Sequence, residues 1–194
     1  MKLSPELKYE TTQEWVKAVL SDFESFIQDH ADCERKASAM AMSFVAKCPD
    51  KVEIIPELIE TALEEMEHFK QVYGLMQKKG IRLKADMPKD AYIQQLLALC
   101  RSSPEQRLMD RMLLASIIEC RGAERFKLIS ENVEDIELKQ FYKMLWISEA
   151  KHGNIFVKMI LNYCNEKDVF ERLDYLVEKE AEICKQLPIR AALH

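Results

Sequence analysis

The sequence contains few of the residues that interrupt or crosslink a fold. Only four of its 194 residues are glycine and six are proline, and no segment has the low complexity of a linker or a disordered tail. Six cysteines are scattered without a single Cys-x-x-Cys pair, which excludes a zinc ribbon and a rubredoxin-type iron site. We therefore expect a helix-rich globular protein whose cysteines are thiols that form no disulfide.

Long apolar runs are also absent. No run approaches the roughly 20 residues of a membrane span, and the first five residues, Met-Lys-Leu-Ser-Pro, do not begin a signal peptide. We expect a cytoplasmic protein with no membrane association. A net charge of −5 argues against indiscriminate nucleic-acid binding, although a local basic patch could still bind one folded RNA.

A repeated pattern of acids and histidines lies within the apolar helical stripes. A glutamate and a histidine three residues apart occur twice, and a single glutamate precedes each copy by 31 and 30 residues. Two helices that each give a Glu, and two that each give Glu-x-x-His, form the ligand set of the ferritin-like dinuclear carboxylate bundle. The predicted metal ligands are Glu34, Glu65, His68, Glu119, Glu149 and His152.

The predicted fold is all-α, a ferritin-like four-helix bundle with one long crossover and accessory helices. We expect a single domain over residues 1–194. Its parts are an N-terminal arm with a short helix (1–20), the bundle (21–164) with its crossover (80–102), and a C-terminal helix (167–187).

Capping signals place the helix ends. Thr11 with Glu14, and Ser21 with Glu24, have the spacing of capping boxes. Gly80 is the expected C-cap of a helix over 51–79, and Ser103 followed by Pro104 begins the third bundle helix. Asp168 and Glu171 are expected to cap the last helix.

A buried glutamate usually belongs to a salt bridge, but no Lys or Arg shares the central positions of these stripes. Two divalent ions would balance four carboxylates, and mixed carboxylate and imidazole ligands suit iron or manganese. The i,i+3 spacing favours Glu65 over its neighbours Glu64 and Glu67. His30, one turn before Glu34, either supports the ligands or is an ordinary core histidine, and we leave it out of the ligand set.

The residues around the ligands resemble a known family. The segments are Asp32–Met40, Glu64–Phe69, Ile118–Phe126 and Ser148–His152, and they are similar to those of the bacterial tRNA 2-methylthio-isopentenyladenosine hydroxylases. The resemblance implies a non-haem di-iron monooxygenase that uses two iron ions, O₂ and electrons from an external reductase to hydroxylate the isopentenyl side chain of a modified adenosine in the anticodon loop of tRNA. It also implies that Glu34 and Glu119 are terminal ligands, that Glu65 and Glu149 bridge the irons, and that each histidine binds one iron.

The tRNA substrate directs attention to the basic residues. Candidate RNA contacts are Lys79, Arg82 and Lys84 in or beside the crossover, and Arg121 and Arg125 beside the site. Solvated lysines near a helix end are the alternative interpretation of the first group. We expect a monomer or a dimer.

Two other functions share this ligand spacing. A ferritin-like protein that oxidises and stores iron would have the same fold, but it would assemble into a closed cage. A di-iron hydroxylase of another small substrate, such as a quinone precursor, would associate with lipid, which the mostly polar outer faces do not favour.

Overall fold

The computed structural model describes residues 3–194, in which seven helices and no strand occur. The chain divides into two compact units. One contains the chain up to Val16, Lys89–Ile189 and His194, and the other contains Lys17–Pro88 and Arg190–Leu193. Within the described residues, no helix is both long enough and apolar enough to cross a membrane.

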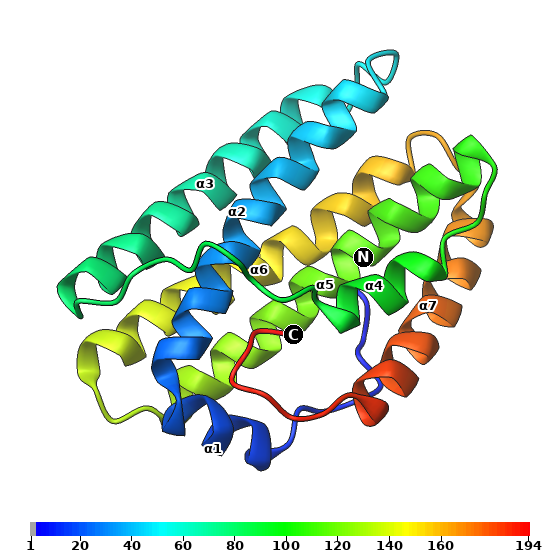
Figure 1. Cartoon of the computed structure of the whole chain (residues 1–194). Coiled ribbons are helices and arrows are strands. Elements are labelled where there is room, and N and C mark those ends of the chain that lie inside the picture. Colours follow the sequence, from blue (N-terminus) through cyan, green and yellow to red (C-terminus); the bar gives the residue numbers. More distant parts are fainter. Residues whose placement is uncertain (1–2) are drawn as a thin grey trace. The chain divides into compact units, whose positions relative to one another are not determined.

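The smaller unit is built on two long helices, α2 (Phe23–Lys47) and α3 (Ile55–Lys78), which lie side by side (Figure 1). The cap of α2 differs from the prediction. Asp22, rather than Ser21, accepts a hydrogen bond from the Ser25 amide at 3.2 Å. Ser21 instead ends the preceding helix and donates its hydroxyl to the Ala18 carbonyl.

The two ends of α3 show how proline and glycine set its length. The helix begins at Ile55, four residues later than predicted, and Pro56 lies in its first turn, where its fixed φ suits a helix start. At the other end Gly80 has a φ of 70°, and the amides of Gly80 and Ile81 donate to Gln77 and Met76. This pair of bonds is a Schellman motif, which confirms the predicted glycine cap.

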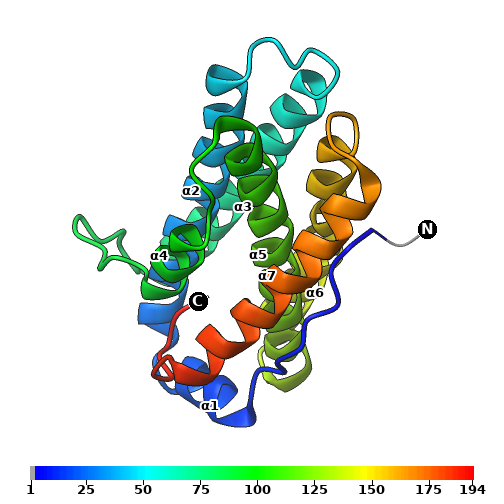
Figure 2. The same cartoon turned by 90° about the vertical axis from the view of Figure 1, so that its right-hand side faces the viewer.

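The larger unit is built on α5 (Pro104–Asn132) and α6 (Ile136–Ile160), which also lie side by side. The short helix α4 (Ala91–Ala98) and α7 (Glu166–Gln186) pack on α5 (Figure 2). The predicted cap of α7 was wrong, because Asn165 accepts from the Lys167 amide and the helix begins three residues before Val169.

The N-terminal arm is tied to α5 by a contact that the sequence did not reveal. Thr11 was predicted to cap α1 (Gln13–Ser21), but its amide and hydroxyl both donate to the carboxylate of Glu124, at 2.7 Å each. The predicted capping box is therefore wrong. The threonine is used to anchor the arm on α5.

Candidate metal centre

Three of the predicted ligands lie together in the unit of α2 and α3. Glu34 lies in the middle of α2, Glu65 and His68 lie one turn apart on α3, and all three are buried. Their donor atoms lie within 4.8 Å of one another. His68 Nδ1 is 3.6 Å from Glu65 Oε2 and 3.7 Å from Glu34 Oε2. We call these three residues the α2–α3 half-site.

The separations within this half-site fit a shared metal ion. Distances of 3.6 and 3.7 Å exceed the usual range of an N–H···O hydrogen bond. Two ligands that each lie about 2 Å from one ion can be as much as ~4 Å apart. Two buried carboxylates this close together also need a nearby cation, because like charges in a buried site destabilise each other.

His30 has a role that the sequence left open. It is fully buried, and its Nε2 lies 2.7 Å from Glu34 Oε1, in hydrogen-bonding range. The other oxygen of Glu34 is the one that faces His68. His30 therefore fixes the orientation of the Glu34 carboxylate, and the i,i+4 spacing of the two residues is the signal that pointed to this contact.

The remaining three predicted ligands form a second cluster, the α5–α6 half-site. Glu119 is on α5, while Glu149 and His152 are one turn apart on α6, and all three are buried. Their donor atoms lie within 4.8 Å of one another, and His152 Nδ1 is 3.1 Å from Glu149 Oε2. The residue four positions before Glu119 is Ala115, so α5 has no counterpart of His30.

Small residues bring the two helices of each pair close together beside the ligands. Ser38 on α2 donates its hydroxyl to the Ala62 carbonyl on α3 at 2.8 Å. Ser116 on α5 makes the matching bond to the Gly153 carbonyl on α6. A Cβ atom on Gly153 would lie only 2.5 Å from the Cys120 sulfur, so a larger residue there would require the Cys120 side chain to move.

Two of the five candidate RNA contacts are buried. Arg121 is 0% exposed and forms two hydrogen bonds to Glu180, at 2.8 and 3.0 Å, and a further one to Glu124. Burial alone would lower the pKa of Arg121, but the bonds to Glu180 raise it above its ordinary value. Arg125 is 8% exposed and lies over the ring of Trp15. The prediction that these two arginines contact RNA is therefore wrong, because both side chains are buried and neither is available to a phosphate.

The other three candidates remain accessible. Lys79, Arg82 and Lys84 are exposed and lie on the connection that follows α3, within the smaller unit. The backbone of this connection is held to α2, because the Gln28 side chain donates to the Arg82 carbonyl at 2.8 Å.

Comparison with known proteins gives one family and related proteins. Residues 2–194 match the family described as tRNA-(MS[2]IO[6]A)-hydroxylase (MiaE). The Pseudomonas putida protein named tRNA 2-(methylsulfanyl)-N(6)-isopentenyladenosine(37) hydroxylase is 32% identical over 187 residues, which cover 94% of this chain and 90% of that protein. A Salmonella typhimurium protein with the same name is 28% identical over 131 residues, 68% of this chain and 47% of that protein.

A solved structure is similar over almost the whole chain. It is described as Protein 43 with aldehyde deformylating oxygenase activity from Synechococcus. The match has a TM-score of 0.91 and 29% identity, and it covers 97% of this chain and 94% of that one. With only helices among residues 3–194, this likeness confirms the predicted all-α, ferritin-like fold.

Proposed function

Because the chain belongs to the tRNA-(MS[2]IO[6]A)-hydroxylase (MiaE) family, we propose that it hydroxylates the isopentenyl side chain of a modified adenosine in tRNA at a centre of two iron ions. It is an enzyme of tRNA modification, and the cytoplasm is where its substrate would be found. The observation that carries the proposal for the metal is the pair of buried half-sites. Each offers two carboxylates and one imidazole whose donor atoms lie within 4.8 Å.

The six residues of the two half-sites would hold the metal ions. Four carboxylates supply a charge of −4, which two divalent ions balance, so the filled centre can stay buried at low cost. When bound, the two ions would supply the activation of O₂. One oxygen atom would enter a C–H bond of the substrate and the other would leave as water, with two electrons and two protons from an external reductase and solvent.

The chain's own contribution is to keep water away and to position the substrate. Phe126, Tyr142 and Phe156 are fully buried on α5 and α6, one to two turns from Glu119, Glu149 or His152. Such an apolar surrounding limits side reactions of the oxidised centre. A prenyl group is a slender apolar chain, so it can enter an apolar site while its nucleoside and the rest of the tRNA remain outside.

The decisive assay combines metal analysis with the fate of the tRNA. Protein reconstituted with ferrous iron is incubated with isopentenylated tRNA, a reductase and isotopically labelled O₂. The tRNA is then digested, and the masses of its nucleosides are measured by mass spectrometry. We expect about two irons per chain and one labelled oxygen atom in the product. Glu65→Ala and Glu119→Ala should lose both iron and activity. The matched control is Glu64→Ala, which removes the exposed neighbour of Glu65 and should keep both.

Two results would contradict the proposal in different ways. If Glu64→Ala, rather than Glu65→Ala, loses iron, the ligand assignment is wrong. If competent di-iron protein leaves the tRNA unchanged and instead consumes an aldehyde, the substrate is wrong and the activity named for the Synechococcus protein becomes the better assignment.

A further inference from the structure

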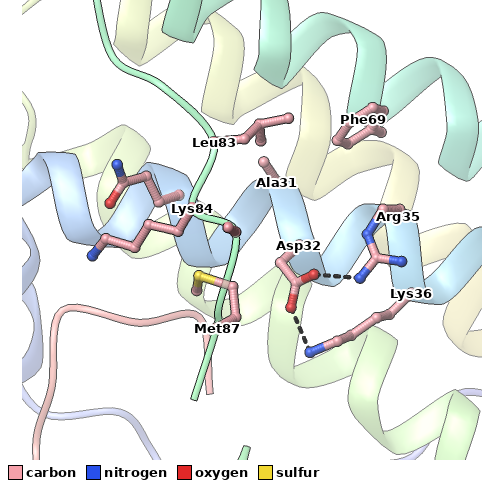
Figure 3. Close-up of a pocket in the computed structure, with 10 residues that line it drawn as sticks. Ala31, Asp32, Arg35, Lys36, Phe69, Leu83, Lys84 and Met87 are labelled. Atoms are coloured by element: carbon pink, nitrogen blue, oxygen red, sulfur yellow. Dashed lines mark hydrogen bonds and ion pairs between the residues drawn. The ribbon is translucent and has the colours of Figure 1, made fainter. Parts of the chain in front are cut away.

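A pocket of about 330 Å³ lies beside α2 in the unit of α2 and α3 (Figure 3). Its wall is formed by one side of α2, by Phe69 on α3, and by Leu83, Lys84, Ala85 and Met87 of the connection that follows α3. The volume is within the range of sites that bind small molecules. All of its lining residues belong to the smaller unit.

The charge of the pocket is opposite in sign to that of the chain. Its lining has three cationic side chains, Arg35, Lys36 and Lys84, and one carboxylate, Asp32, so its formal charge is three minus one, or +2. Asp32 pairs with both Arg35 and Lys36, at 2.6 and 2.5 Å. One carboxylate cannot neutralise both cations, but it holds them next to each other, as Figure 3 shows. The chain as a whole carries −5.

Apart from Gln28, whose side chain donates to the Arg82 carbonyl, the rest of the wall is apolar. Phe69, Leu83 and Met87 line the pocket together with the small Ala31. The ring of Phe69 also stacks on that of Tyr73, with centroids 6.2 Å apart and planes 14° apart. A flat apolar wall beside paired cations matches a nucleotide, whose base packs on aromatic and aliphatic side chains while its phosphate binds Arg and Lys.

The pocket adjoins the α2–α3 half-site along both helices. Arg35 directly follows Glu34, and Phe69 directly follows His68. One residue along a helix turns the side chain by about 100°, so the pocket lies on the face next to the one that carries the ligands. A nucleotide bound there would be held beside the metal ligands without displacing them.

We propose that this pocket binds one nucleotide of the tRNA anticodon loop, with a phosphate on Arg35 and Lys36 and the base against Phe69 and Leu83. The proposal rests on the tRNA substrate of the proposed function, and it adds the residues that hold the RNA. A single-stranded loop suits such a site, because its bases can leave the stack at low cost. Lys84, on the other side of the pocket from Arg35 (Figure 3), would meet a neighbouring phosphate.

The test is equilibrium binding of an isopentenylated anticodon stem-loop RNA to the iron-loaded protein at several salt concentrations. Arg35→Gln/Lys36→Gln should weaken binding about tenfold or more and reduce the slope of log affinity against log salt by about two. Phe69→Leu should weaken binding about tenfold without changing the slope, because it removes stacking and no charge. Lys47→Gln/Lys70→Gln is the matched control, because it removes the same charge from exposed positions outside the pocket.

The outcomes separate this proposal from the one on which it rests. If the wild type binds and hydroxylates the RNA while the Arg35/Lys36 variant behaves like the control, the pocket assignment is wrong and the function stands. If the wild type neither binds nor hydroxylates the RNA, both proposals fail. If adenosine monophosphate binds as tightly as the stem-loop and depends on the same residues, the pocket is a free-nucleotide site and the RNA assignment is overturned.

Discussion

The α2–α3 and α5–α6 helix pairs carry matching sets of candidate metal ligands but differ in their surroundings. α5 is held by the buried ion pair of Arg121 with Glu180 of α7, and by the buried carboxylate of Asp110, which pairs with the partly exposed Arg101 and Arg172. Beside α2 there is a pocket instead, and the cations of its pairs, Arg35 and Lys36, have side chains that are 54% and 52% exposed. The difference indicates that the α5–α6 helix pair is held rigidly, whereas the α2–α3 helix pair leaves charged side chains available to a ligand.

The largest loss of stability should come from breaking the ion pair between Arg121 and Glu180 in the larger unit. Glu180 is 0% exposed, and Arg121→Met would leave its carboxylate buried without the guanidinium. Removing one partner of a buried pair typically destabilises a protein by about 3–5 kcal/mol. Urea unfolding of the metal-free protein, followed by circular dichroism, would measure this loss.

The smaller unit supplies the control. Arg35→Gln breaks an exposed pair and should change the free energy of unfolding by about 1 kcal/mol or less. The double variant Arg121→Met/Glu180→Leu should recover much of the loss, since it leaves no lone buried charge. Equal stability of the Arg121 and Arg35 variants would show that the contrast between the two units has no energetic basis.

A smaller effect is expected on the iron affinities of the two half-sites. In the α2–α3 half-site His30, which is not itself a candidate ligand, lies within hydrogen-bonding range of the candidate ligand Glu34, whereas the equivalent position of α5 is Ala115. His30→Leu removes this hydrogen bond, and loss of such a support typically weakens metal binding about 10- to 100-fold. A ferrous titration against a competing chelator should show one iron weakened and the other nearly unchanged.

The control for this experiment removes a histidine elsewhere. His194→Leu changes a residue of the larger unit that lies beside Asp90 and Tyr92, and both irons should bind as in the wild type. Equal weakening of both irons in His30→Leu would mean that the histidine supports the fold as a whole rather than one half-site.

The sequence predicted those features that depend on spacing within one helix. Glu-x-x-His places its two side chains on one helical face wherever it occurs, so the pattern alone picked out candidate ligands whose donor atoms the structure brings close together. The fold class was also predicted correctly, because each long helix carries its own apolar stripe. Gly80 was correctly identified as a cap, since a φ of 70° suits glycine above all other residues.

Features that depend on distant residues could not be predicted. Arg121 looked like an RNA contact until its partner, Glu180, was found 59 residues away on α7. Thr11 had a capping sequence, but Glu124 competes for its amide and hydroxyl. The pocket depends on Leu83, Lys84, Ala85 and Met87, whose segment has no helical period that would have placed it beside α2.

The smallest expected effect concerns stability at acid pH, which should differ between variants in the two units. In the larger unit, Asp90 caps α4 by accepting from the amides of Tyr92 and Ile93, and it lies 3.4 Å from His194 Nδ1. Burial alone would raise the pKa of Asp90. The interactions with His194 and with the two amides outweigh burial and lower this pKa from 3.8 to about 2.

A carboxylate whose pKa is lower in the folded than in the unfolded protein stabilises the fold above the unfolded value. The contribution of Asp90 should therefore be complete above about pH 4 and should be lost as the pH falls toward 2, a change of about 2 kcal/mol. Asp90→Asn keeps a good cap but cannot titrate, so its free energy of unfolding should fall less steeply between pH 4 and 2. Asp50→Asn, at a residue of the smaller unit whose side chain is 72% exposed and pairs with Lys51, should change the acid slope much less, because an exposed pair contributes little to stability. An unaltered slope in Asp90→Asn, measured by urea unfolding at each pH, would remove this carboxylate from the acid response of the larger unit.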